Sequence, residues 1–170
     1  MNMRIICKIT WMGLGLISLA QVLPAAEFSY SLGTVPAPAH PDTTPPSLLC
    51  DGLYTNVQKD SVQFNNHLKL SVDLKMEQTV RRVTLHAFQL QNQYVVGDYE
   101  LLSSMDGTKW VSQGTVMNSQ MSESVEQVTL TVDKTFEARY LMLKIHKAPG
   151  IVRMMLGELV VDCGAPPTVG

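Results

Sequence analysis

Short runs in which apolar and polar residues alternate occupy most of the chain after Leu48. In the run HLKLSVDL, the residues Leu68, Leu70, Val72 and Leu74 would lie on one face of a β-strand, and polar residues would lie on the other. The runs VRRVTLHAF, DYELLSS, VEQVTLTV, RYLMLKI and LGELVVDCG repeat this pattern. No run shows the i, i+3, i+4 spacing of an amphipathic helix. The sequence therefore predicts an all-β fold.

Turn-forming pairs separate the predicted strands. Asp51-Gly52, Asp106-Gly107 and Pro149-Gly150 are typical of tight turns. Several short alternating strands must bury their apolar faces against each other, which favours an antiparallel β-sandwich or jelly roll over a single open sheet. Besides the four residues above, the predicted core contains Val83, Leu85, Ala87, Tyr99, Leu101, Ser103, Val128, Leu130, Val132, Leu141, Leu143, Ile145, Leu159, Val161 and Cys163.

The first 26 residues have the features of a secretory signal peptide. Arg4 and Lys8 precede a mainly apolar run from residue 9 to residue 23, and Ala25 and Ala26 provide small residues for cleavage. The run is shorter than the roughly 20 residues that span a bilayer. We therefore expect an exported protein, either secreted or periplasmic.

The remaining chain divides into three segments. Residues 27–47 form a proline-rich arm, in which the alternation of Phe28, Tyr30 and Leu32 could alternatively add one edge strand. Residues 48–164 form the β-sandwich domain, and residues 165–170 form a short tail. A chain of this size accommodates one domain.

The charge balance argues against two classes of partner. The chain has 13 Lys and Arg and 15 Asp and Glu; without Arg4 and Lys8, 11 basic residues face 15 acidic ones, a formal charge of −4. Nucleic acids and anionic membranes both require basic surfaces. We therefore expect neither a nucleic-acid partner nor membrane contact.

Two cysteines remain after Cys7 is removed with the signal peptide. Cys50 and Cys163 lie near the two ends of the strand-forming region. Because exported proteins are oxidised, we expect these two residues to form a disulfide. The alternative is a pair of buried free thiols.

Several fragments in order resemble a known family. DGLYTN, LKLSVDL, YELLSSMDGTKW, EARYLMLKI and GELVVDCG together resemble the discoidin or coagulation-factor type C domain. This galactose-binding-like jelly roll is shared with the carbohydrate-binding module of galactose oxidase. The resemblance extends over residues 48–164.

The resemblance implies a structural calcium ion. In this family the loop that bears Asp-Gly meets a glutamate of the final strand, and the matching residues here are Asp51 and Glu158. Calcium takes about six to eight oxygen ligands. The other expected ligands are the side chain of Asn56 and the carbonyls of Leu48, Leu53 and Gly157. The alternative is a simple turn in which Asp51 caps local amides.

The resemblance also implies that ligands contact loops at one rim of the sandwich. These loops are residues 59–66, 89–97 and 147–155. Sugar sites combine aromatic rings with amide, imidazole or guanidinium groups. The candidate ligand-binding residues are Phe64, Asn65, Asn66, His67, Gln91, Asn92, Tyr94 and Arg153.

An apolar cluster in the third loop allows another interpretation. Ile151, Val152, Met154 and Met155 could contact a protein or a membrane, or could begin the last buried strand.

No motif for catalysis is present. The four histidines lack the spacing of a zinc site, and the sequence has neither a Gly-x-Ser-x-Gly motif nor a phosphate-binding loop. We therefore predict a secreted, non-catalytic module that binds a glycan. The alternatives are an adhesion or assembly module that binds a cell-surface or extracellular protein, and a hydrolase with an unrecognised site.

Overall fold

The computed structural model describes residues 27–164. The predicted signal peptide and the predicted tail lie outside the described residues. In the described part, no helix is long and apolar enough to cross a membrane. The elements are β1 (Ser29–Leu32), the 3-10 helix η1 (Leu48–Cys50), β2 (Val62–Phe64), β3 (Leu68–Gln89), β4 (Val96–Ser104), β5 (Val111–Met117), β6 (Glu126–Lys147) and β7 (Met154–Cys163).

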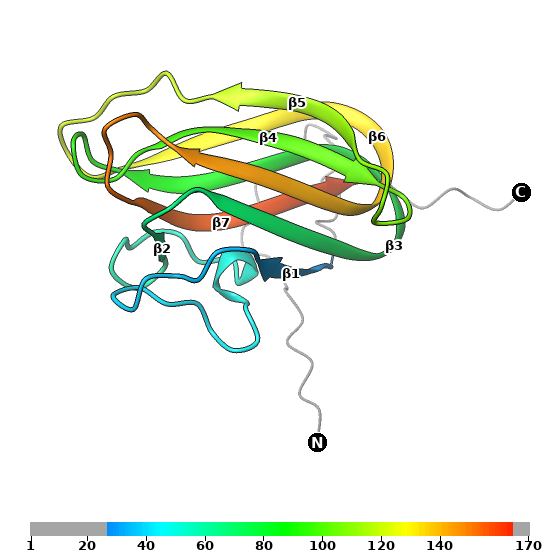
Figure 1. Cartoon of the computed structure of the whole chain (residues 1–170), viewed down its shortest axis with the longest axis horizontal. Coiled ribbons are helices and arrows are strands. Elements are labelled where there is room, and N and C mark those ends of the chain that lie inside the picture. Colours follow the sequence, from blue (N-terminus) through cyan, green and yellow to red (C-terminus); the bar gives the residue numbers. More distant parts are fainter. Residues whose placement is uncertain (1–26, 165–170) are drawn as a thin grey trace, which may run out of the picture.

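All of the strand pairs are antiparallel. Hydrogen bonds connect the strands in the order β2-β7-β3-β6-β4-β5, and β1 pairs with β3 (Figure 1). The first part of β3 pairs with β1, whereas its second part pairs with β7. Strands that change neighbours along their length contribute to both layers of a sandwich. The structure thus confirms the predicted all-β jelly roll.

The two central strands are longer than the sequence predicts. β3 and β6 each contain 22 residues, and each joins two runs that we expected to form separate strands. Their register shifts between Asp73 and Gln78. Lys75 in this irregular segment has a φ of 71°, which is unusual for a residue with a side chain. Neither Gly nor Pro occurs at this bend, so the sequence gives no local signal of where the strand bends.

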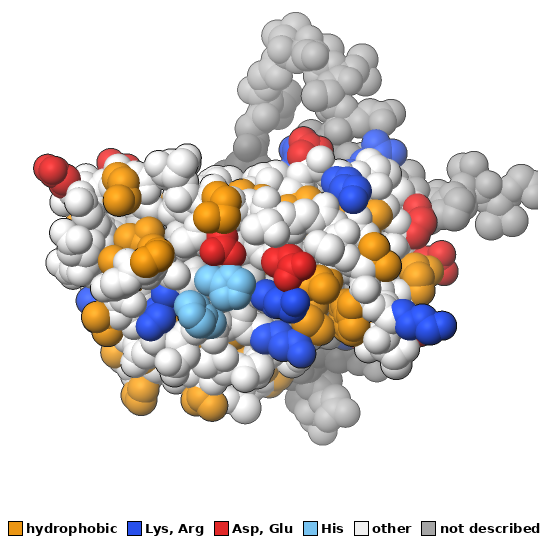
Figure 2. Space-filling model, turned by 45° about the horizontal axis from the view of Figure 1, so that its top comes forward, with side chains coloured by type: hydrophobic (Ala, Val, Ile, Leu, Met, Phe, Trp, Pro, Cys, Tyr) orange, Lys and Arg blue, Asp and Glu red, His pale blue; other side chains and the backbone are white. Residues whose placement is uncertain are grey.

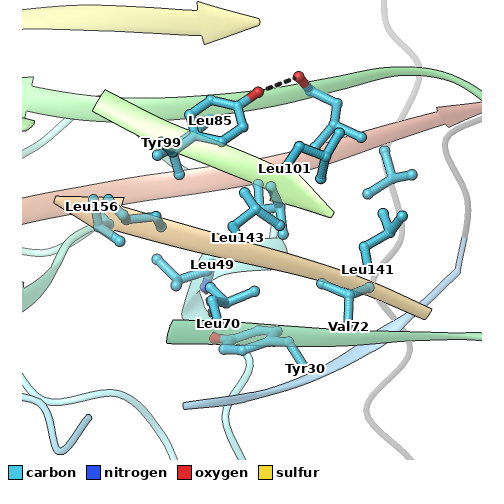
Figure 3. Packing of buried hydrophobic residues seen from close by; sticks show 14 of the residues in the cluster. Tyr30, Leu49, Leu70, Val72, Leu85, Tyr99, Leu101, Leu141, Leu143 and Leu156 are labelled. Carbon is cyan, nitrogen blue, oxygen red and sulfur yellow. Dashed lines mark hydrogen bonds between the residues drawn. The ribbon is translucent and has the colours of Figure 1, made fainter. Parts of the chain in front are cut away.

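The apolar side chains of these strands form one main core. All of the predicted core residues are buried. Figure 3 shows Leu70 and Leu85 of β3 together with Leu101 of β4 and Leu143 of β6 in this core. The period-2 prediction of which face lies inside is therefore confirmed.

Residues 27–47, the predicted proline-rich arm, pack along the domain. The alternative that we considered for its beginning is confirmed, because Tyr30 pairs with Val72 as part of β1. Further along, the Ala37 N–H donates to the carbonyl of Gln63 at 2.8 Å, and the Gln63 N–H donates to the carbonyl of His40 at 2.9 Å. The arm therefore hydrogen-bonds to a strand that otherwise pairs only with β7.

Candidate functional site

One cation joins two of the three predicted loops. The Lys147 ammonium donates to the carbonyl of Asn65 at 2.7 Å and to that of Val152 at 3.2 Å. The Lys147 main-chain N–H donates to Nδ1 of His67 at 3.1 Å. We call residues 65–67, 90–95 and 148–153 the rim loops.

Main-chain contacts attach the second rim loop, residues 90–95, to the third, residues 148–153. Tyr94 forms a β-bridge with Arg153, and the Ala148 N–H donates to the carbonyl of Val95 at 3.1 Å. The three loops therefore meet at one end of the sandwich. This arrangement brings together segments that are far apart in the sequence.

The two aromatic rings predicted to contact a ligand are not available for stacking. Phe64 is 0% exposed and packs in the main core, so its prediction as a ligand-binding residue is wrong. Tyr94 is 6% exposed, and the guanidinium of Arg153 lies 5.6 Å from its ring centroid. Burial raises the pKa of the Tyr94 phenol.

The polar candidates are more accessible. Asn65, Asn66, His67 and Asn92 are exposed, and Gln91 is partly buried. Because Nδ1 of His67 accepts the Lys147 N–H, the neutral imidazole carries its proton on Nε2. The rim loops thus present amides, an imidazole N–H and a guanidinium, all of which can bond sugar hydroxyls or carboxylates.

Charged side chains continue from the rim loops onto the adjacent sheet. Nδ1 of His146 lies 2.7 Å from a carboxylate oxygen of Asp98, and its ring contacts that of His67 at a centroid distance of 5.1 Å. Figure 2 shows two adjacent histidines beside acidic and basic side chains on one face. Nearby, the Lys144 ammonium donates to Glu100 at 3.0 Å, and this hydrogen bond lowers the pKa of the Glu100 carboxyl.

An open hollow of about 400 Å³ is lined by none of the predicted glycan-binding residues. It is lined by Thr55, Asn56, Val57, Gln58, Phe88, Val125, Glu126 and Gln127. Phe88 and Val57 also belong to a small apolar cluster that contains Tyr94, so this cluster links the hollow to the rim loops. The polar run TNVQ was the available sequence signal, but only the fold brings it next to residues 125–127.

The wall of the hollow is held by several hydrogen bonds. One carboxylate oxygen of Asp60 accepts the N–H groups of Thr55 and Asn56 at 3.0 and 2.9 Å. The Gln127 carboxamide donates to the carbonyl of Tyr54 at 2.6 Å, and the Tyr54 ring stacks on His86 at 4.3 Å. A wall held in this way loses little conformational entropy when a ligand binds.

The expected calcium ligands Asp51 and Glu158 lie near each other. Oε1 of Glu158 accepts the N–H of Gly52 at 3.2 Å, whereas Oε2 is buried without a partner. Burial, together with the smaller effect of the Asp51 charge, raises the pKa of the Glu158 carboxyl to about 8. A buried oxygen without a partner, next to a second carboxylate, is an arrangement that a cation would stabilise.

The structure gives less support to two other expected calcium ligands. The side-chain oxygen of Asn56 accepts the N–H of Gln58 at 2.9 Å, and Leu53 is exposed. Within residues 27–164 no group of three or more His, Cys, Asp or Glu side chains is placed to hold a metal ion. A calcium ion here would therefore use two carboxylates together with main-chain carbonyls such as those of Leu48 and Gly157.

The predicted disulfide is not formed. Cys163 has a free thiol and is 3% exposed. Gly52, two residues after Cys50, contacts Glu158, which precedes Cys163 by roughly 17 Å of extended strand. A disulfide needs Cα atoms about 4.4 to 6.8 Å apart. The prediction that Cys50 pairs with Cys163 is therefore wrong.

The apolar cluster of the third loop is mostly internal. Met154 and Met155 are buried at the start of β7, as one of our two interpretations predicted. Val152 is 69% exposed, and Ile151 is partly buried. The exposed apolar surface of this loop is therefore small.

Comparisons with known proteins agree with this fold. The NanJ family 32 carbohydrate-binding module of Clostridium perfringens, solved with galactose, has 16% identity and a TM-score of 0.55, covering 79% of this chain and 92% of that one. CBM32-1 of a Clostridium perfringens family 31 glycoside hydrolase has 15% identity and a TM-score of 0.57, covering 79% and 93%. The C-terminal domain of a Bacteroides fragilis chitobiase has 16% identity and a TM-score of 0.54, covering 81% and 93%.

These similarities concern the fold, because all of the identities are low. A comparison with curated proteins gives no match. The model of the F5/8 type C domain matches residues 34–156, which is more than half of the chain. The chain therefore belongs to the F5/8 type C domain family.

Proposed function

We propose that the protein is a secreted, non-catalytic module that binds a glycan at the end of the sandwich where the rim loops meet. The observation that supports this most is the convergence of the three loops around Lys147, with Asn66 and His67 exposed and Arg153 partly exposed. Amide, imidazole and guanidinium groups match the hydroxyl and ring-oxygen pattern of a sugar.

The hollow lined by Gln58 and Gln127 extends this surface. Its amides and hydroxyl lie beside the apolar side chains of Val57 and Val125. A sugar ring has both polar hydroxyls and an apolar C–H face, so it suits such a lining. The NanJ module was solved with galactose, and another Clostridium perfringens family 32 module was solved with a GalNAc-β-1,3-galactose disaccharide.

A protein partner is the alternative function. It would favour a broad apolar surface, as in the buried centre of protein interfaces. Val152 is the strongly exposed apolar side chain in the rim loops, with Met154 and Met155 inside the domain. This distribution supports a glycan rather than a protein at the rim.

A glycan array tests the proposal. We expect specific binding that falls about tenfold or more in the variants His67→Ala and Asn66→Ala, because each variant removes a hydrogen-bonding group. Lys134→Ala, an exposed residue between the two runs of β6, is the matched control and should bind normally. A silent array together with protein capture in pull-down experiments would refute the glycan proposal.

We also propose that Asp51 and Glu158 hold a structural calcium ion. The support is the buried, partnerless Oε2 of Glu158 beside Asp51. The ion would supply positive charge that joins the loop after η1 to β7. Its test is a stability measurement, described in the Discussion.

A further inference from the structure

The rim loops and the hollow differ in charge, although both belong to the proposed glycan-binding end. The hollow contains the carboxylate of Glu126 and no basic residue. The rim loops and the adjacent sheet contain Lys69, Lys147 and Arg153. The comparison of these two surfaces indicates which kind of sugar unit each would accept.

The acidic side chains near the rim loops are already paired. Asp98 forms a hydrogen bond with the ring of His146, and Glu100 forms a salt bridge with Lys144. Lys69 lies opposite Lys144 in the register of β3 and β6, so two cations are neighbours on this face. Among the described residues, no carboxylate forms a salt bridge with Lys69, Lys147 or Arg153. The rim therefore has an excess of positive charge, although the chain has a formal charge of −2.

The positive groups also have geometry suited to an anion. The guanidinium of Arg153 is held over the Tyr94 ring, which limits its freedom, and a guanidinium can bind a carboxylate or sulfate with two parallel hydrogen bonds. The exposed Nε2–H of His67 is a further donor, since Nδ1 is occupied by the Lys147 N–H. Lys147 adds charge while it joins the two loops.

We propose that the rim loops bind an acidic sugar unit, one that carries a carboxylate or a sulfate group. This inference rests on the proposed glycan-binding function and specifies its ligand class. Arg153 contacts the anionic group, His67 donates from Nε2, and the amides of Asn65 and Asn66 bond neighbouring hydroxyls. The carboxylate of Glu126 repels such a group from the hollow, so the hollow binds neutral sugar units of the same glycan.

Matched sugars test this inference without any variant. Galactose, glucose and mannose are compared with their uronic acids and their 6-sulfates by calorimetric titration of the full chain, at low and high salt. For each neutral sugar that binds, we expect its acidic counterpart to bind about tenfold more tightly. High salt should reduce this preference for the acidic sugar, because ions screen the attraction. The uronic acid and sulfate arms distinguish the two sources of the negative charge.

Variants at one position then locate the effect. Arg153→Gln should weaken binding of the acidic sugar more than binding of its neutral counterpart and so abolish the preference, and Arg153→Lys should retain part of the preference. Lys134→Gln removes an exposed cation elsewhere and should change neither.

The outcomes separate the two proposals. Equal binding of neutral and acidic sugars, or a preference that survives Arg153→Gln, would overturn the acidic-sugar inference and leave glycan binding intact. If none of these sugars nor any glycan on the array binds, both proposals fail.

Discussion

The phenol of Tyr99 lies inside the sandwich, where its hydroxyl connects two other strands. It donates to the carbonyl of Val83 in β3 at 2.8 Å and accepts the N–H of Val132 in β6 at 3.1 Å. Figure 3 shows the ring among the buried leucines. A buried hydroxyl without partners is costly, and this one both donates and accepts a hydrogen bond.

Tyr99→Phe should therefore destabilise the protein without changing its core volume. We expect a loss of about 1 to 3 kcal/mol in the free energy of unfolding, because the Val83 carbonyl and the Val132 N–H lose their partner. Urea denaturation measures this difference. Tyr140→Phe, at a partly buried position, is the control and should cost less; equal losses in the two variants would contradict the explanation.

The buried thiol of Cys163 should make stability depend on pH in the alkaline range. Burial raises its pKa to about 11, from 9.0, with smaller contributions from Asp162 and Glu137. Because the pKa is higher in the folded state than in the unfolded state, the contribution of the protonated thiol to the free energy of unfolding is complete below about pH 9. This contribution is lost as the pH rises toward 11.

The measurement is a pair of unfolding curves at pH 8 and pH 11. We expect the wild type to lose on the order of 2 kcal/mol more than Cys163→Ala over this interval, because the variant has no thiol to ionise. Equal losses of unfolding free energy in the wild type and in Cys163→Ala would show that Cys163 does not contribute to the pH dependence. Tyrosines titrate in both proteins and cancel in the difference.

At the scale of elements, Asp42 organises the arm on the domain. Its Oδ1 accepts the N–H groups of Thr43, Ser47 and Leu48 at 2.7, 3.1 and 3.0 Å. Its Oδ2 accepts the hydroxyl of Tyr30 in β1. One carboxylate therefore connects the beginning of the arm to the start of η1.

Asp42→Ala should release the arm. We expect a loss of about 2 kcal/mol, since hydrogen bonds to a charged group are stronger than neutral ones, and faster amide exchange over residues 43–48. Hydrogen exchange followed by mass spectrometry measures the second effect. Asp133→Ala, which removes an exposed ion pair with Arg82, should leave exchange in the arm unchanged. Unchanged exchange in Asp42→Ala would contradict this role.

At the scale of the whole molecule, the proposed calcium ion would join the two ends of the domain. Glu158 belongs to β7, and Asp51 follows η1, so a shared ion would connect segments more than 100 residues apart. A ligand that binds only the folded state stabilises it according to its concentration.

Calcium should accordingly raise the melting temperature, and chelation should lower it. At a calcium concentration of about 100 times Kd, the gain is about 2.7 kcal/mol. Glu158→Gln keeps the shape of the side chain and removes its charge, so this variant should not respond to calcium. Magnesium, which prefers a smaller octahedral shell, is the ionic control. An equal response of wild type and Glu158→Gln would refute the proposed ligand.

The sequence allowed us to predict which segments form the loops of the site, but not which of their residues are accessible. The three rim loops were predicted and do meet, because turn and polar residues between buried strands must lie at the surface. Phe64 was predicted as a contact because it is an aromatic residue in the first predicted loop, yet the arm on one side and β7 on the other enclose its short strand. The hollow was missed because residues 55–58 and 125–127 become neighbours only across strands.

Alternation with a period of two sets burial locally, so the sequence predicts the all-β class and the inward face of each strand. The family resemblance aligned the segments of Asp51 and Glu158 and so indicated that they approach each other. The folded structure was needed to establish that two pairs of runs are continuous strands, that Cys163 is unpaired and that cations gather at the rim. Each of these depends on which strands become neighbours and in what register, and that choice is made by packing over the whole chain.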